Sequence, residues 1–124
     1  MNWSATAGFL LALAVALGAF GAHSLRGRLD DYSMSVYERA VFYHFVHALG
    51  ILIVAALARS GGLTLVAQVK ISWLLFLGIC FFCGSLYALA VSGIKMLGAI
   101  TPLGGLAFIA GWIWLAVELL RGKS

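Results

Sequence analysis

The chain has 124 residues, of which 64% belong to the hydrophobic set and only 10% are charged. Soluble domains have about 25% charged residues, so a soluble fold of this size would lack the polar surface to cover its core. The net charge of +4 comes from cations scattered over connections and ends, with no basic run interleaved with aromatics, which argues against nucleic acid as a partner. Composition therefore predicts one domain, residues 1–124, surrounded by the lipid bilayer.

The first apolar segment covers residues 5–22. About 20 residues at roughly 1.5 Å rise cross a hydrocarbon core, so this segment is long enough for a transmembrane helix. Met1 to Phe9 contains no Lys or Arg, whereas a signal peptide begins with a positive region, so we expect a retained helix. The connection from Ser24 to Ser35 is charged and long enough for a short helix at the membrane surface.

Three more apolar segments follow, at residues 36–58, 71–91 and 97–120. Thr101-Pro102 is typical of a helix start, with Thr as N-cap and Pro at the first helical position, so we place the last helix at 101–120 and expect a loop at 96–100. None of the segments alternates with period two, and an open sheet leaves unpaired backbone groups in lipid. The sequence predicts an all-α membrane protein with four transmembrane helices in an antiparallel bundle.

If the chain crosses the membrane four times, its tryptophans and tyrosines, which favour the membrane interface, fall on opposite faces. All tryptophans fall toward the membrane face that holds both termini, called here the terminal face, and all tyrosines toward the opposite, non-terminal face. The tryptophans are Trp3, Trp73, Trp112 and Trp114; the tyrosines are Tyr32, Tyr37, Tyr43 and Tyr87.

Orientation is harder to predict, because the cations divide equally. Arg59, Lys70, Arg121 and Lys123 belong to the terminal face, and Arg26, Arg28, Arg39 and Lys95 to the other. All acids except Glu118 lie on the non-terminal face. This distribution favours cytoplasmic termini.

Small residues four apart indicate close helix packing, within the bundle or in a homo-oligomer. Ala14, Gly18 and Ala22 share one stripe, and Gly84 with Ala88 and Ala107 with Gly111 repeat the spacing. The glycines predicted to permit close approach are Gly18, Gly21, Gly84, Gly104 and Gly105.

The histidines are the polar residues with most chemical potential. His44 and His47 are three apart and share a helix face, and His23 lies where the first helix leaves the same half of the membrane. Polar side chains at this depth are costly and suggest a function: metal or haem ligation, proton handling or small-ligand binding. The structural alternative is a hydrogen bond from each imidazole to a neighbouring helix. Further polar residues of this candidate site are Glu38, Arg39, Ser85, Tyr87 and Thr101.

Cys80 and Cys83 form a C-x-x-C pattern inside an apolar run. Residues three apart on a helix hold their Cβ atoms about 5–6 Å apart, whereas a disulfide needs roughly 3.8 Å. We interpret both as small packing residues. No nucleophile has a base at motif spacing, and no phosphate-binding glycine loop is present, so we expect neither an enzyme nor a cofactor.

Four motifs, in order along nearly the whole chain, resemble one family. They are Gly18-Ala19-Phe20-Gly21-Ala22-His23, Tyr43-His44-x-x-His47-Ala48, Cys83-Gly84-Ser85-Leu86-Tyr87 and Thr101-Pro102-Leu103-Gly104-Gly105. They resemble the small bacterial inner-membrane proteins of the YgdD/YwdK type, related to a eukaryotic TMEM protein, in which Ser usually stands at the position of Cys83. The resemblance implies a four-helix inner-membrane protein of uncharacterised function and brings no substrate, cofactor or catalytic residue.

Two functional hypotheses follow. The first is a non-enzymatic packing or accessory component of a membrane assembly or homo-oligomer, in which the glycines and histidines specify helix contacts. The second is a module that binds or transports a metal, haem, lipid or small solute in the half of the bundle that contains His23, His44 and His47.

Overall fold

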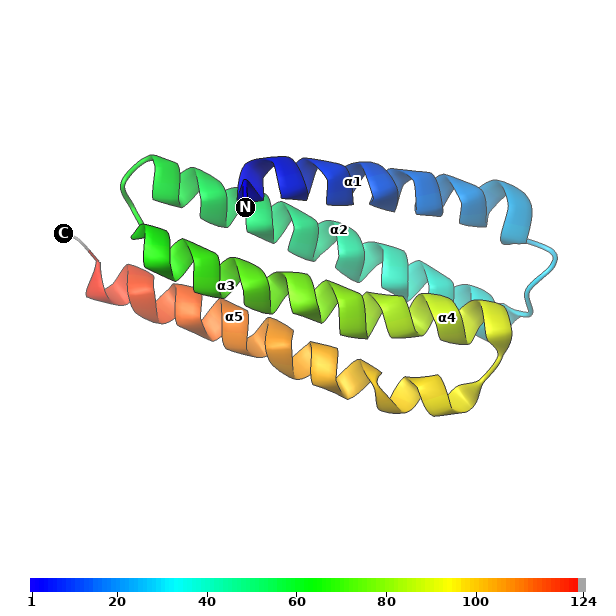
Figure 1. Ribbon diagram of the computed structural model, residues 1–124. Coiled ribbons are helices and arrows are strands. Elements are labelled where there is room, and N and C mark those ends of the chain that lie inside the picture. The colour runs from blue at the N-terminus through cyan, green and yellow to red at the C-terminus, as the bar shows by residue number, and fades with distance from the viewer. Residues whose placement is uncertain (123–124) are drawn as a thin grey trace.

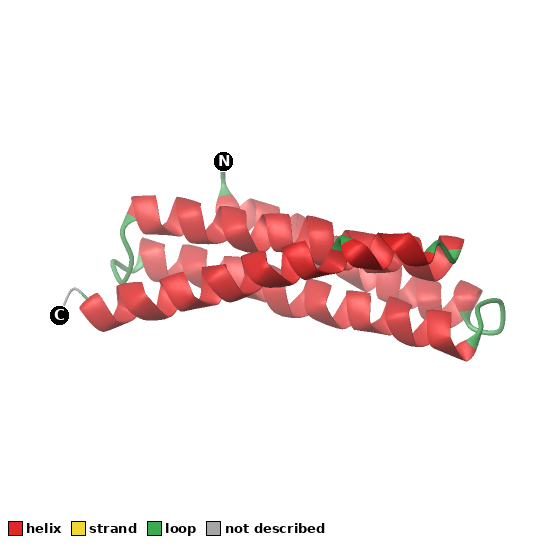
Figure 2. Ribbon diagram, turned by 90° about the horizontal axis from the view of Figure 1, so that it is seen from below, coloured by secondary structure: helices red, strands yellow, loops and turns green. Residues whose placement is uncertain are grey.

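A computed structural model describes residues 1–122 as a bundle of four long helical spans joined by short connections (Figures 1 and 2). The spans cover Trp3–Leu25, Asp31–Arg59, Leu65–Ser92 and Lys95–Arg121, and each is long and apolar enough to cross a membrane. Successive spans run in opposite directions, so both ends of the described chain lie toward the same end of the bundle (Figure 1). Within the described residues no strand is present, and the predicted all-α, four-span architecture is confirmed.

Each of the first three helices begins earlier than its apolar run, at a polar side chain that caps it. The first helix, α1 (Trp3–Phe20), follows Asn2, whose side chain accepts from the Ala5 N–H at 3.0 Å. The helix α2 (Asp31–Arg59) follows Asp30, and α3 (Leu65–Gly78) follows Thr64. Such caps satisfy backbone donors that have no partner within the helix. The apolar runs thus mark where hydrocarbon begins, and the caps mark where the helix begins.

Three local expectations were wrong. The short surface helix between the first two spans is absent from the described chain, because residues 31–35 already belong to α2 and only 26–30 turn between the spans. Residues 95–99 form the 3₁₀ helix η3 (Lys95–Ala99) instead of a loop, and the N-cap of α5 (Thr101–Arg121) is Ile100 rather than Thr101. The Thr101 hydroxyl has a different partner, described below. Lys123, counted above among the terminal cations, lies outside the described residues.

Two segments of π-helix interrupt the spans. The first, η1 (Gly21–Leu25), ends the first span, and the second, η2 (Ile79–Cys83), separates α3 from α4 (Gly84–Ser92) in the middle of the third. A π turn inserts one extra residue and so pushes the backbone outward on one side. The backbone of η2 at Phe82 lies against Gly104 of α5, the helix of the fourth span.

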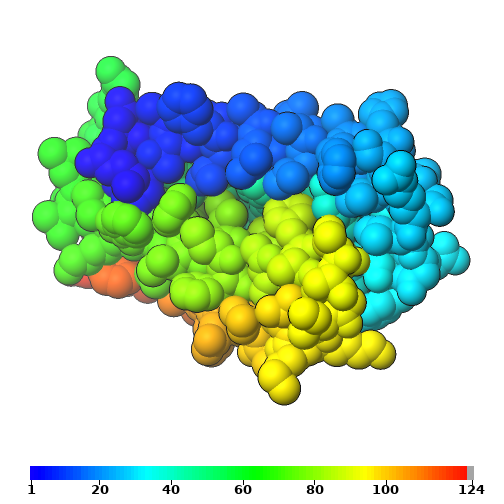
Figure 3. All heavy atoms as spheres, turned by 45° about the vertical axis from the view of Figure 1, so that its right-hand side comes forward, coloured from blue at the N-terminus to red at the C-terminus, as the bar shows by residue number. Residues whose placement is uncertain are grey.

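The spans differ in how much of their surface is covered. The second and third spans form the centre; α1 packs mainly on α2, and α5 packs on α3 and η2. In the most apolar stretch, 44% of residues are buried in each central span, against 17% in the first and 22% in the fourth. Figure 3 shows the first span (blue) uncovered along its length. The outer spans therefore offer most of the apolar surface that lipid or another protein must cover.

Candidate functional site

The polar residues of the non-terminal half join neighbouring spans one pair at a time. The first pair is α1 and α2, where the Tyr37 hydroxyl donates a hydrogen bond to the backbone carbonyl of Leu17. The Tyr37 ring lies directly on Gly21, where a Cβ atom would collide with ring atoms. Gly21 is therefore needed for the close approach that this hydrogen bond requires.

The second joint connects α2 with α4. Nδ1 of His44 lies 2.9 Å from the Tyr87 hydroxyl, and the His44 side chain is almost fully buried, at 2% exposure. Nε2 of His44 is also buried and has no hydrogen-bond partner. The Tyr87 ring meets the edge of Tyr37 at a centroid distance of 5.3 Å. His44, Tyr87 and Tyr37 thus form one cluster that touches the first three spans.

The third joint connects α4 with α5 through two hydroxyl groups. Ser85 Oγ donates to the carbonyl of Phe82 at 3.0 Å and lies 2.6 Å from Thr101 Oγ1. A serine hydroxyl has one proton, so Thr101 is the donor to Ser85. This is why the Thr101 hydroxyl does not cap α5: it is used between helices.

His47 behaves differently from His44 although both lie on one helix face. Its Nδ1 is 2.8 Å from the carbonyl of Tyr43, one turn earlier on α2. Its ring stacks on Phe108 of α5, with centroids 3.5 Å apart and planes 11° apart. His47 therefore contacts the fourth span through its ring, not through the hydrogen bond to another helix that its spacing suggested.

The remaining predicted polar residues lie at the surface. His23 and Arg39 are exposed, and Glu38 pairs with Arg26 at 2.9 Å between two exposed side chains. Among residues 1–122, no three His, Cys, Asp or Glu side chains lie close enough to hold a metal ion. The structure thus brings together Ser85 with Thr101 and His44 with Tyr87, and it does not gather the three histidines.

The glycines predicted to permit helix approach divide into three classes. A Cβ on Gly104 would lie 2.7 Å from Phe82 Cβ, in η2. Gly18 and Gly105 make ordinary contacts, at 3.5 Å to Val41 and 3.8 Å to Phe82. A Cβ on Gly84 would meet nothing within 4 Å, so the predicted contact of Gly84 is absent within the chain.

Sequence reasoning missed the partner of Gly104. Gly78 of α3 lies under the Phe108 ring, and its Cβ would lie 3.1 Å from the carbonyl of Gly104. Gly104 and Phe108 are four residues apart and so lie on one face of α5. This spacing is the sequence signal that could have shown that the same neighbour, Gly78, contacts both. The π turn of η2 has no comparable signature in the sequence.

The interpretation of both cysteines as packing residues fits Cys83, which is buried, but not Cys80, which is exposed. Both are free thiols, Cys80 exposed on the outside of η2 and Cys83 buried inside. Neither has the pairing that a redox or metal function would require.

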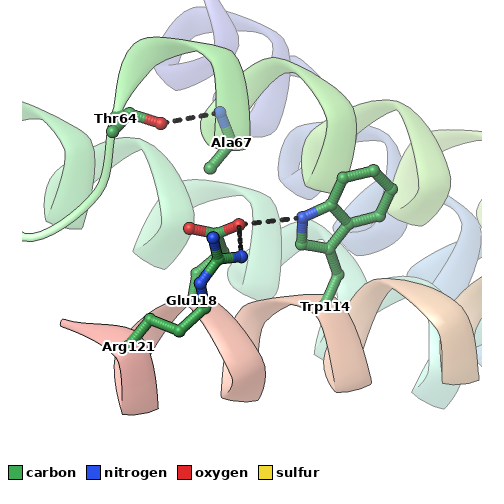
Figure 4. Close-up of polar contacts among 5 residues, drawn as sticks. All are labelled: Thr64, Ala67, Trp114, Glu118 and Arg121. Carbon is green, nitrogen blue, oxygen red and sulfur yellow. Dashed lines mark hydrogen bonds and ion pairs between the residues drawn. The ribbon is translucent and has the colours of Figure 1, made fainter.

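Among the described residues, the terminal half has no comparable side-chain hydrogen bonds between spans. Its side-chain hydrogen bonds stay within one helix end or helix (Figure 4): Thr64 accepts from the Ala67 N–H at 3.0 Å, and the Trp114 indole donates to Glu118 at 3.2 Å. Glu118 also pairs with Arg121 at 3.7 Å, as expected from their spacing. The spans meet here through rings, with Trp3 and Trp73 edge to face at 5.2 Å.

The fold and these contacts define a class: a multi-pass membrane protein whose buried polar groups mostly link its own spans. Residues 17–105 match a family described as protein of unknown function (DUF423). The chain is 50% identical to a UPF0382 membrane protein of Staphylococcus haemolyticus, over 88% of this chain and 87% of the relative. It is also 50% identical to the UPF0382 membrane protein YwdK of Bacillus subtilis, over 88% of each chain.

The chain therefore belongs to this family of membrane proteins of unknown function, and the YwdK-type resemblance is confirmed. A relative from Staphylococcus aureus strain NCTC 8325 is 48% identical over 88% of this chain and 87% of its own length. No solved structure matches the chain.

Proposed function

We propose that this protein is a non-enzymatic component of the bacterial inner membrane, which packs against copies of itself or against a partner membrane protein. One observation supports this proposal: four of the eight residues suggested as a site join the chain's own spans, namely His44, Ser85, Tyr87 and Thr101, and Tyr37 joins two spans in the same way. Tyr37, Tyr87 and Thr101 each contribute a hydroxyl to an interhelix hydrogen bond, so none is free to act on a substrate. A buried polar group that is already bonded specifies packing more readily than chemistry.

The surface suggests where another chain would pack. Gly84 and Ala88 are exposed on the outside of α4, one turn apart, and no atom of the chain lies within 4 Å of a Cβ on Gly84. Small residues at this spacing allow two helices to approach closely in lipid. The proposed contact therefore uses the one predicted glycine that the bundle itself leaves open.

Photocrosslinking in native membranes tests this contact. Benzoylphenylalanine in place of Ala88 reacts with nearby C–H bonds, so it works in hydrocarbon where a thiol reagent reacts poorly. The expected result is a discrete product with a second protein chain, lost when Gly84→Leu is added. The Gly84→Leu side chain enters open space and leaves the contacts within the chain intact. The matched control carries benzoylphenylalanine in place of Phe9, which is 79% exposed on α1. It reports the crosslinking caused by random collisions in the membrane.

Adducts with lipid alone at position 88 would contradict the packing contact, as would a protein adduct that Gly84→Leu leaves unchanged. Mass spectrometry of the product then separates a second copy from a different partner.

We also propose that both termini face the cytoplasm. The cations tie at four on each side, so the positive-inside rule does not decide the orientation. The proposal is supported only by the acids, of which one lies on the terminal face and three lie on the other. Single cysteines at Asn2 and at Tyr32, which is 60% exposed near the start of α2, in a chain whose native cysteines are replaced by Ser, report the sidedness. A membrane-impermeant thiol reagent added to intact spheroplasts should label position 32 and not position 2. The reverse pattern would overturn the orientation.

A further inference from the structure

A cavity of about 340 Å³ lies between α2, η2 and α5 on the side of the bundle away from α1. Its volume is within the range of pockets that hold small molecules. It is lined by Tyr43, His47, Phe82, Gly105, Phe108, Ile109 and Trp112, so its walls are aromatic and none of these residues is charged. The three polar joints described above use none of its side chains.

His47 contributes one free polar atom to this cavity. A carbonyl oxygen can only accept, so Nδ1 of His47 must carry the proton that it donates to Tyr43. In a neutral imidazole the other nitrogen, Nε2, is then an acceptor without a proton. His47 is only 5% exposed and lines the cavity, so a ligand in the cavity is what can reach this acceptor.

The cavity lies near the middle of the membrane. His47 is eight residues from Arg39 and twelve from Arg59, which corresponds to about 12 Å and about 18 Å along the helix. The 56% exposed Ile109 stands at its rim, on the lipid-facing side of α5. A ligand would therefore enter from the bilayer and would have to be soluble in it.

The lining restricts what this ligand is. A charged head would find no counter-charge among the lining residues, and a head without a donor would leave the acceptor unpaired in hydrocarbon. The Tyr43 and Phe108 rings are within 22° of parallel, and His47 lies within 12° of both. Phe108 itself is only 4% exposed because it packs against His47 and Gly78, so a planar aromatic head would stack on the partly exposed rings of Tyr43, Phe82 and Trp112.

We propose that this cavity, the His47 cavity, binds the head of a lipid-soluble hydroquinone or phenol, whose hydroxyl donates a hydrogen bond to Nε2 of His47. The ligand is bound without any change in its oxidation state. The site is additional to the packing contact on α4, because it lies on α2 and α5 and uses none of the exposed residues Gly84 and Ala88.

The test titrates the full chain in lipid nanodiscs with decylhydroquinone and measures the ligand retained beyond that in empty nanodiscs of the same lipid. Saturable binding of about one ligand per chain is expected. His47→Phe keeps the ring stack but removes the acceptor, and should weaken binding about tenfold or more. His23→Phe, which changes an exposed imidazole outside the cavity, should leave binding unchanged.

Two ligand controls separate the hydroxyl from the ring. The dimethyl ether of decylhydroquinone has the same shape but no donor, and dodecanol has a donor but no ring. Both should bind at least about tenfold more weakly. Equal binding of the ether would overturn the hydrogen bond to His47, and equal binding of dodecanol would overturn the aromatic head.

A second variant decides the matter if His47→Phe does not fold. Gly105 faces the cavity, and an added Cβ there makes only ordinary contacts of 3.8 and 3.9 Å with the Phe82 ring. Gly105→Leu should therefore fold, as judged by circular dichroism and thermal midpoint, and should abolish binding by filling the space. Retained binding in this variant, or uptake no greater than that of empty nanodiscs, would overturn the proposal.

Discussion

The two halves of the bundle are held together in different ways. In the non-terminal half, hydrogen bonds of Tyr37, Tyr87 and Thr101 connect each span to the next. In the terminal half, large rings lie against other rings or against glycines, as where Trp112 covers Gly50 and Trp3 meets Trp73. The non-terminal half therefore combines directional bonds with close packing, as where Tyr37 lies on Gly21, whereas the described part of the terminal half relies on shape.

This difference follows from the solvent. In lipid, burial of apolar surface does not drive helices together, because acyl chains are as apolar as leucine. Close van der Waals packing and interhelix hydrogen bonds remain as the means of association, and the two halves use them in different proportions. The packed contacts should be sensitive to added volume, and the hydrogen bonds to the loss of a single atom.

The largest effect is expected at Gly104, in the non-terminal half, where close packing accompanies the hydrogen bond of Thr101 one turn earlier. In Gly104→Ala the new methyl group would lie 2.7 Å from Phe82 Cβ and 2.8 Å from Phe82 Cα, and a backbone cannot rotate away as a side chain can. We expect a loss of about 3 kcal/mol in the free energy of unfolding. Unfolding by SDS in mixed micelles measures it.

Gly84→Ala is the matched control for this change, since its methyl group enters open space. It should alter the unfolding free energy of the monomer by no more than about 1 kcal/mol, and in the stabilising direction, because Ala is the better helix former. Similar losses at both positions would mean that glycine acts through helix propensity and not through contact.

The gross architecture could be predicted from the sequence, because span length and hydropathy follow from membrane thickness alone. The contact partners could not. Residues such as Gly18 and Gly84 share a spacing rule with Gly111, yet only Gly111 packs tightly, with a Cβ 3.0 Å from Leu75. The rule gives the face of a helix but not the rotation of that face toward a neighbour.

The polar residues show the same limit. Spacing placed His44 and His47 on one face of α2, but one hydrogen-bonds Tyr87 and the other stacks on Phe108. Which neighbour each imidazole meets depends on where α4 and α5 cross α2. The π turn of η2, which lies against α5, has no sequence signature.

A smaller effect is expected for the bond between His44 and Tyr87. A double-mutant cycle with His44→Phe and Tyr87→Phe isolates its contribution, which should be about 0.6 kcal/mol and at most about 1.7 kcal/mol. Tyr87→Phe alone should cost more, about 1–3 kcal/mol, because it leaves a buried imidazole with no partner on either nitrogen. A coupling energy of zero would show that the hydroxyl and the imidazole are neighbours without a stabilising bond.

Thr101→Val should have a lesser effect, since it removes one neutral hydrogen bond and keeps the shape of the side chain. Ser85 retains its bond to the Phe82 carbonyl, so no donor is left unpaired. We expect a loss of about 0.6 kcal/mol in the same unfolding assay. Thr6→Val, which removes a bond within α1 alone, is the control; an equal loss in both variants would remove the special role of the interhelix bond.

The smallest effect is expected at the aqueous edge of the hydrogen-bonded half, where Asp30 caps α2. The Ser33 N–H donates to the Asp30 carboxylate at 2.7 Å, and this bond holds the pKa of Asp30 below its usual value of 3.8. A carboxyl whose pKa falls on folding stabilises the fold above the unfolded pKa, and this stabilisation is lost as the pH drops through the lower, folded pKa. The unfolding free energy of the native chain should therefore decrease between about pH 6 and pH 3 by more than that of Asp30→Asn. Asn keeps the capping oxygen but does not titrate. Equal slopes of unfolding free energy against pH in the two chains would therefore mean that the acid sensitivity comes from another carboxyl group. In that case α2 would be anchored by its buried bonds alone.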